Sequence, residues 1–181
     1  MVNTANKDEL LKLLRSGLIE KFNESRSYDE ELLNLTELDF KDTGVCGANL
    51  SRVDLSGSDL SETELNTVNF TGSDLSSVNF SHAVLTDCSL ADTVLEGSVF
   101  NKAALINCDF TAAEFNGANI MGADFTGSDL SLCENLMHTA YDKNTVWPSD
   151  ECLPDEFDPE YDHSFAELED DTEFSEDQFS Y

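Results

Sequence analysis

The sequence predicts an all-β solenoid, and two regularities carry that prediction. Between Leu35 and Leu130 every fifth residue is large and apolar, and from Ala48 to Ser128 a small residue stands two positions before it. A step of five residues scatters side chains around an α-helix and moves them to opposite faces of a strand. A chain that bends once per five-residue unit instead directs every large residue toward one common axis.

The five-residue period runs without interruption through twenty units. The large residues are Leu35, Phe40, Val45, Leu50, Leu55, Leu60, Leu65, Phe70, Leu75, Phe80, Leu85, Leu90, Leu95, Phe100, Leu105, Phe110, Phe115, Ile120, Phe125 and Leu130. Because broadly hydrophobic residues make up 40% of the chain, a chance run of this length has a probability on the order of one in a hundred million. One large and one small side chain per unit would fill a narrow core.

Units such as ANLSR, SDLSE, VNFTG, CDFTA and ADFTG share one pattern: a small residue, Asp or Asn, Leu or Phe, and two variable residues. Over roughly residues 33–133 this pattern resembles the pentapeptide repeat family, with a likeness to its bacterial and cyanobacterial members. The resemblance implies a right-handed β-helix of square cross-section with four units per coil. Twenty units would make about five coils, stacked about 4.8 Å apart in a rod roughly 20 Å long.

Four units replace the usual Asp or Asn with an apolar residue, at Val84, Val94, Val99 and Ala104. One interpretation is an apolar contact face on this stretch of the rod. The other, which is favoured, is that valine simply suits a β-ladder.

Residues 1–32 precede the repeats and are expected to form a capping helix with a lead-in to the first coil. Asn6 is a candidate N-cap with Glu9 three positions later, and apolar residues follow at helical spacing. These are Leu10, Leu11, Leu14, Leu18, Ile19 and Phe22. An open solenoid end exposes core and unpaired backbone groups, so a helix here would cover them. A partner-binding helix is the alternative.

Residues 134–149 are expected to cap the other end of the solenoid. Their sequence contains AYDKNTVWP, which resembles a post-repeat motif of bacterial pentapeptide repeat proteins. The apolar residues available to cover the last coil are Leu132, Leu136, Met137, Tyr141, Val146 and Trp147.

The net charge of −29 is distributed unevenly along the chain. Residues 1–32 carry 5 basic and 7 acidic residues, residues 33–132 carry 3 and 15, and residues 133–181 carry 1 and 16. Direct nucleic-acid binding is excluded by this balance, since phosphate contacts need cations. Anionic membrane surfaces are disfavoured for the same reason.

Residues 150–181 are predicted to form an acidic, aromatic tail that is disordered on its own, because they contain too little apolar area for a core. Acidic residues would steer the tail to a protein partner with a basic surface or groove, and its apolar side chains would be buried there. The candidate partner-binding residues are Phe157, Tyr161, Phe165, Leu168, Phe174, Phe179 and Tyr181. A purely solubilising tail is the alternative.

We find no pattern typical of a catalytic, metal or cofactor site. His82, His138 and His163 are scattered, and no nucleophile, zinc or phosphate-binding motif is present. No catalytic residue, metal ligand or cofactor is therefore expected.

The chain has five cysteines, an odd number, without CxxC spacing, which argues against a disulfide framework or a zinc site. Cys88 and Cys108 fall in the column of small residues, so both are expected to be buried thiols. A redox role for Cys46 or Cys152 stays open.

The sequence favours a non-enzymatic protein–protein interaction module, a scaffold or regulator that offers an acidic rod and tail to a partner. The alternative comes from the resemblance, since quinolone-resistance proteins of the family mimic DNA toward DNA gyrase. Five coils are short for that role. No apolar run is long enough to span a membrane, and the start MVNTANKDELLKLL does not resemble a signal or transit peptide, so we expect a cytoplasmic protein. The oligomeric state stays open.

Overall fold

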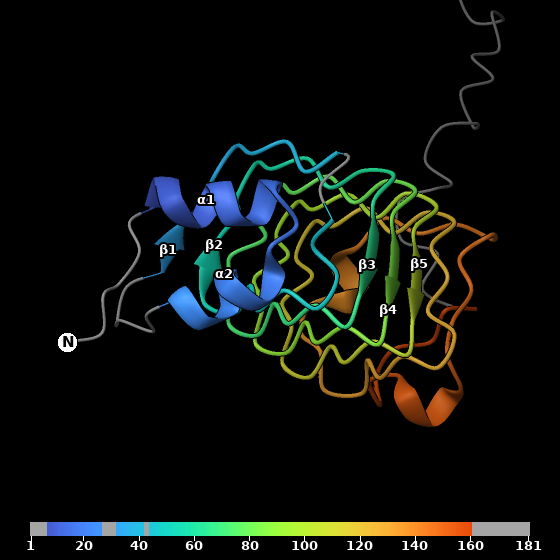
Figure 1. Ribbon diagram of the computed structural model, residues 1–181. Helices are drawn as coiled ribbons and strands as arrows, with labels where there is room; N and C mark the ends of the chain where they lie inside the picture. The colour runs from blue at the N-terminus through green and yellow to red at the C-terminus, as the bar shows by residue number, and fades with distance from the viewer. Residues whose placement is uncertain (1–6, 27–31, 42–43, 161–181) are drawn as a thin grey trace, which may run out of the picture.

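The computed structural model describes residues 7–26, 32–41 and 44–160. Two helices come first, α1 (Lys7–Arg15) and α2 (Ile19–Ser25). Short strands follow: β1 (Leu33–Asn34), β2 (Val53–Asp54), β3 (Glu64–Asn66), β4 (Val84–Thr86) and β5 (Ala104–Ile106). The 3-10 helices η1 (Leu136–His138) and η2 (Asp150–Cys152) lie near the other end. Figure 1 shows the chain winding in stacked turns, with α1 and α2 at one end.

All strand pairing is parallel within this described part, and it joins residues twenty positions apart. β1 pairs with β2 through Leu33 and Val53, and β3, β4 and β5 form a three-stranded sheet in chain order. Isolated bridges continue the same register, for example Asn69 with Ser89. Twenty residues equal four five-residue units, so the chain returns to the same face after every fourth unit, as the family resemblance implies.

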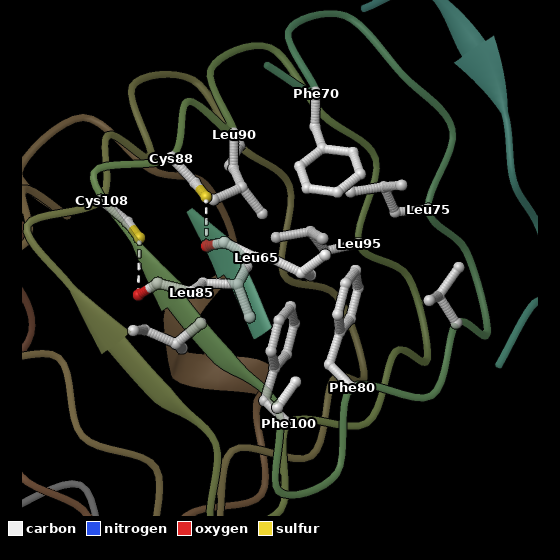
Figure 2. Close-up of a cluster of buried hydrophobic side chains, with 14 of the residues drawn as sticks. Leu65, Phe70, Leu75, Phe80, Leu85, Cys88, Leu90, Leu95, Phe100 and Cys108 are labelled. Carbon is white, nitrogen blue, oxygen red and sulfur yellow. Dashed lines mark hydrogen bonds between the residues drawn. The ribbon is translucent and has the colours of Figure 1, made fainter. Parts of the chain in front are cut away.

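The core consists of the two residue columns that the sequence predicts. The twenty large residues from Leu35 to Leu130 are at most 2% exposed, and the column of small residues from Ala48 to Ser128 is also buried. Equivalent residues of adjacent turns stack directly: the rings of Phe80 and Phe100 lie 4.8 Å apart with an interplanar angle of 3° (Figure 2). Burial of both columns confirms the predicted one-large, one-small packing.

The recurrent Asp or Asn has a local structural cause. In the unit around Leu55, Asp54 Oδ1 accepts hydrogen bonds from the Ser56 N–H at 3.0 Å and from the Ser56 hydroxyl at 2.7 Å. Such a side-chain oxygen satisfies the backbone N–H two residues on and holds the bend in place. The residue after Ser56 is Gly57, whose φ of 69° completes the corner.

The N-terminal segment covers the first turn, but it does so with two helices rather than the single capping helix expected within residues 1–32. α1 ends at Arg15, and Gly17, whose φ is 66°, terminates it with hydrogen bonds from Gly17 N–H to Leu14 O and from Leu18 N–H to Leu13 O. This is a Schellman ending, which reverses the chain at a glycine. Leu18 therefore points outward and is exposed, a correction to its predicted place on the apolar face.

Side chains of the second helix region close the open edge of the first turn. Asn23 Nδ2 donates to the Gly47 carbonyl at 3.0 Å, and Asn23 Oδ1 accepts from the Asn49 N–H at 2.7 Å. The buried Arg26 guanidinium donates to the carbonyls of Asn49 and Ser51. These groups replace the ladder bonds that a preceding turn would supply.

The parallel register continues past Leu130, where the regular repeats end. The bridges are Glu114 with Glu134, Asn119 with Ala140 and Asp124 with Val146, which lie 20, 21 and 22 residues apart. Leu130 N–H also donates to the Cys152 carbonyl at 2.8 Å. The stacked part therefore extends through η2, beyond the boundary expected at residue 149 between the cap and the tail.

Candidate functional site

Phe157 is the one predicted partner-binding residue that the structure describes, and it is buried. Its ring lies 5.0 Å from Trp147 and 5.8 Å from Tyr141, centroid to centroid. Trp147 in turn stacks on Phe125 at 5.9 Å with an interplanar angle of 7°. Phe157 thus helps to cover the end of the core, in contrast to its predicted place on a docking tail.

The remaining predicted docking residues fall outside the described part of the chain. They are Tyr161, Phe165, Leu168, Phe174, Phe179 and Tyr181. Their role stays a prediction.

A hollow of about 400 Å³ opens between residues 133–137 and residues 154–157. Leu136, Met137 and Phe157 give it apolar walls, and the exposed side chains of Asp155 and Glu156 add two carboxylates. Cys133 also lines the hollow, and burial raises the pKa of its thiol to about 12, so it stays protonated at neutral pH. The hollow therefore combines apolar surface with negative charge.

Acidic residues stack on one another along the outside of the solenoid. Four bridges join two acids: Asp39 with Asp59, Asp54 with Asp74, Asp109 with Asp129, and Glu114 with Glu134. All six of these aspartates accept a hydrogen bond from the backbone N–H two residues on. Hydrogen bonds from serine two residues on lower the pKa of Asp59 and Asp129.

Glu114 and Glu134 are different. Both side chains are exposed, and neither carboxylate accepts a hydrogen bond from the backbone N–H two residues on, as Asp109 and Asp129 do. Like charges opposite each other on adjacent strands destabilise a sheet. This pair therefore places two like charges in register on adjacent turns without contributing to the bend.

The four apolar replacements do not form one face. Val84 and Ala104 pair with each other in the β3–β4–β5 sheet. Val94 bridges to Asp74 and Glu114, and Val99 bridges to Asn79 and Asn119, so both lie in other ladders. The hypothesis of a single apolar contact patch over these four residues is therefore wrong.

The predicted buried thiols are in place. Cys88 and Cys108 are buried side by side in adjacent turns (Figure 2), and the hydrogen bond with Cys88, together with burial, raises the pKa of Cys108. Cys46 is exposed and Cys152 is half-buried. His82 and His138 are exposed, and the described residues contain no group of three or more potential metal ligands. No helix among them is both long and apolar enough to cross a bilayer.

A family model described as the pentapeptide repeat region matches residues 63–137. A pentapeptide repeat protein from the thylakoid lumen of Arabidopsis thaliana is 30% identical, over 54% of this chain and 68% of that one, with a TM-score of 0.31. This chain belongs to the pentapeptide repeat family.

Other solved pentapeptide repeat proteins also match. Rfr23 from the cyanobacterium Cyanothece 51142 is 28% identical, over 65% of this chain and 86% of that one, with a TM-score of 0.34. QnrB1, a plasmid-mediated fluoroquinolone resistance protein, is 17% identical, over 66% of this chain and 72% of that one, with a TM-score of 0.32. No functionally curated protein matches the chain.

Sequence reasoning missed two features of this pentapeptide repeat protein. The hollow depends on how residues 154–157 pass over residues 133–137, which no periodic pattern encodes. The edge-closing roles of Asn23 and Arg26 were also missed. A basic residue directly after an amphipathic helix, here Arg26, was the signal that could have predicted the edge-closing role.

Proposed function

We propose that this pentapeptide repeat protein is a non-enzymatic interaction module, a scaffold or regulator that binds a protein partner with a basic surface. Its frame is a right-handed quadrilateral β-helix. The closely packed core leaves binding to the outer surface, the ends and the segment after residue 160.

The observation that carries this proposal is the exposed pair Glu114 and Glu134. Two carboxylates on adjacent rungs repel each other, and the pair has no role in holding its turn. A basic group from a partner would relieve the repulsion and gain binding free energy. Residues 133–160 contain Lys143 as their single basic residue, so this end of the molecule favours cationic partners.

The acidic segment over residues 161–181 is the second proposed contact. Its aromatic residues recur among acidic ones, a composition suited to burial in a basic groove. Phe157 is not included in this contact because it is buried in the described structure.

Affinity capture from an extract of the source organism tests the proposal, with bound proteins identified by mass spectrometry. The bait is compared with a variant in which Phe165, Phe174 and Phe179 are alanine and with a control in which Ser164 and Ser175 are alanine. We expect one partner with a basic surface to be held by the natural chain and the control and lost by the aromatic variant. Equal capture by all three would refute docking through the tail.

The alternative is a DNA-like surface that inhibits or protects a DNA-binding enzyme such as DNA gyrase. The stacked acidic pairs favour it, because they place carboxylates at the spacing of the ladder along the solenoid. Binding of this kind would survive the aromatic substitutions and weaken steeply as salt rises. Capture of topoisomerase subunits by all three baits, with release at moderate salt, would establish it over tail docking.

A further inference from the structure

The last turn of the solenoid has an open ladder edge. One turn earlier, the Ala112 N–H donates to the Leu132 carbonyl at 3.1 Å, and the Ala113 carbonyl accepts from the Glu134 N–H at 2.8 Å. The equivalent groups twenty residues on are the Leu132 N–H and the Cys133 carbonyl. Neither has a backbone hydrogen-bond partner among the described residues, although residues 154–157 pass nearby.

Cys133, one of the two residues with an unused backbone group, lines the hollow, and Leu132 precedes it in the chain. The hollow separates residues 133–137 from residues 154–157, so the two segments do not form the next rung. Its volume of about 400 Å³ falls within the roughly 300–1,000 Å³ typical of ligand pockets. Unpaired backbone groups beside an apolar hollow are the elements of strand addition, in which an extended peptide pairs with an open edge.

Charge selects the occupant. Asp155 and Glu156 line the hollow, and Glu134 lies between two residues that line it. An acidic segment would be repelled there, including residues 161–181 of this chain, and a second copy would bring the same charges. A cationic side chain would be attracted.

We propose that this hollow binds an extended segment of a partner protein in which basic and apolar side chains alternate. The segment pairs through its backbone with the Leu132 N–H and the Cys133 carbonyl. Its apolar side chain contacts Met137, and its basic side chain reaches the carboxylates of Asp155 and Glu156. This contact is separate from the proposed docking of residues 161–181.

The test uses the full chain and a fluorescent hexapeptide of alternating lysine and valine, titrated by anisotropy at about 0.15 M salt, where surface attraction is screened beyond about 8 Å. Two control peptides carry glutamate in place of lysine, or methyl groups on the backbone nitrogens. Met137→Asp disturbs the exposed wall of the hollow. Val146→Asp is its matched control, since Val146 is equally exposed but does not line the hollow.

We expect Met137→Asp to weaken binding of the lysine peptide by about tenfold or more, the effect of losing one good apolar contact, and Val146→Asp to leave it within about twofold. Both control peptides should fail to bind, and hydrogen exchange at residues 130–137 should slow when the lysine peptide is bound. Equal binding of the N-methylated peptide would overturn the proposal, because attraction by charge alone needs no backbone pairing.

One further outcome identifies a different occupant. If the lysine peptide binds only after Phe165, Phe174 and Phe179 are replaced by alanine, the chain's own tail fills the hollow and the proposal is overturned. Loss of partner capture in the aromatic variant, with peptide binding unchanged, would separate this inference from the tail-docking function.

Discussion

Replacing Arg26 with alanine should destabilise the N-terminal end of the solenoid. The buried guanidinium donates to the carbonyls of Asn49 and Ser51 and lies 5.9 Å from the centre of the Phe22 ring. Hydrogen bonds to charged groups contribute about 1.5–3 kcal/mol each, and a cation–π contact adds about 0.5–1 kcal/mol. Because water can reach part of the vacated edge, we expect a loss of about 3–5 kcal/mol rather than the full sum.

The assay is urea unfolding followed by circular dichroism, together with hydrogen exchange at residues 44–52. Because each repeat unit contacts only its neighbours, an end turn can open locally, so faster exchange there should accompany the loss of unfolding free energy. Arg26→Lys should recover only part of it, since one ammonium lacks the planar fork that reaches both carbonyls. Lys21→Ala, at an exposed position of α2, is the control and should change stability by less than about 0.5 kcal/mol.

If Arg26→Ala unfolds at the same urea concentration as the natural chain, with unchanged exchange at residues 44–52, the guanidinium does not close the edge. The same reasoning would then fail for Asn23, whose amide makes the neighbouring pair of bonds.

Four further substitutions test the core, the corners and the turn-forming acids. Phe100→Ala should cost about 3–5 kcal/mol in urea unfolding, because it removes a fully buried ring; a cost below 1 kcal/mol would contradict the packing described. Gly127→Ala should destabilise the protein, because φ is 72° there and the new Cβ would lie 2.3 Å from Asn107 Oδ1. Gly44→Ala is its control, because the new Cβ meets open space, and it should be neutral or slightly stabilising. Hydrogen bonds from Ser131 lower the pKa of Asp129 in the folded state. Ionised Asp129 therefore stabilises the fold above the pKa of the unfolded chain, about 4, and this stabilisation is lost as pH falls through the folded-state pKa. The stability difference between the natural chain and Asp129→Asn should therefore shrink in acid, and a pH-independent difference would refute this.

The middle of the fold could be predicted from sequence because it is nearly one-dimensional. Each unit contacts mainly its neighbours in the same turn and in the adjacent turns. A large residue such as Leu65 therefore meets the same environment as Leu85 and Leu105, with which it is in register. One repeated rule specifies burial, turn and register together.

The N-terminal helix was predicted in kind but not in detail. Helical spacing continues through Gly17, and the apolar pattern alone gives no reason to stop there. The Schellman ending is decided by a local glycine with φ of 66° and by the need to fold Phe22 onto the core. Glycine in the middle of a helical pattern was the signal for the break.

The C-terminal end was predicted only in part, because its spacing departs from five: Leu136, Tyr141 and Trp147 pack on the core as expected, whereas Leu132, Met137 and Val146 are exposed. Beyond Leu130 the buried core residues are Cys133, Leu136, Tyr141, Leu153 and Phe157, with Trp147 packed beside them. Insertions of one or two residues shift the register from 20 to 22, so a search at fixed period stops while the stacking continues. Phe157 was assigned to the tail for this reason.

The two ends of the solenoid solve the open-edge problem differently, and the difference indicates where binding occurs. At the first turn, Asn23 and Arg26 satisfy the exposed backbone groups, which removes the edge as a template for pairing. At the last turn the Leu132 N–H and the Cys133 carbonyl have no backbone partner among the described residues, and Cys133 lines a hollow. An open edge invites pairing with any chain, including a second copy, and acidic residues around it oppose a copy with the same charges. The same charges favour a basic segment, so the edge can stay open for one class of partner and be protected from self-association.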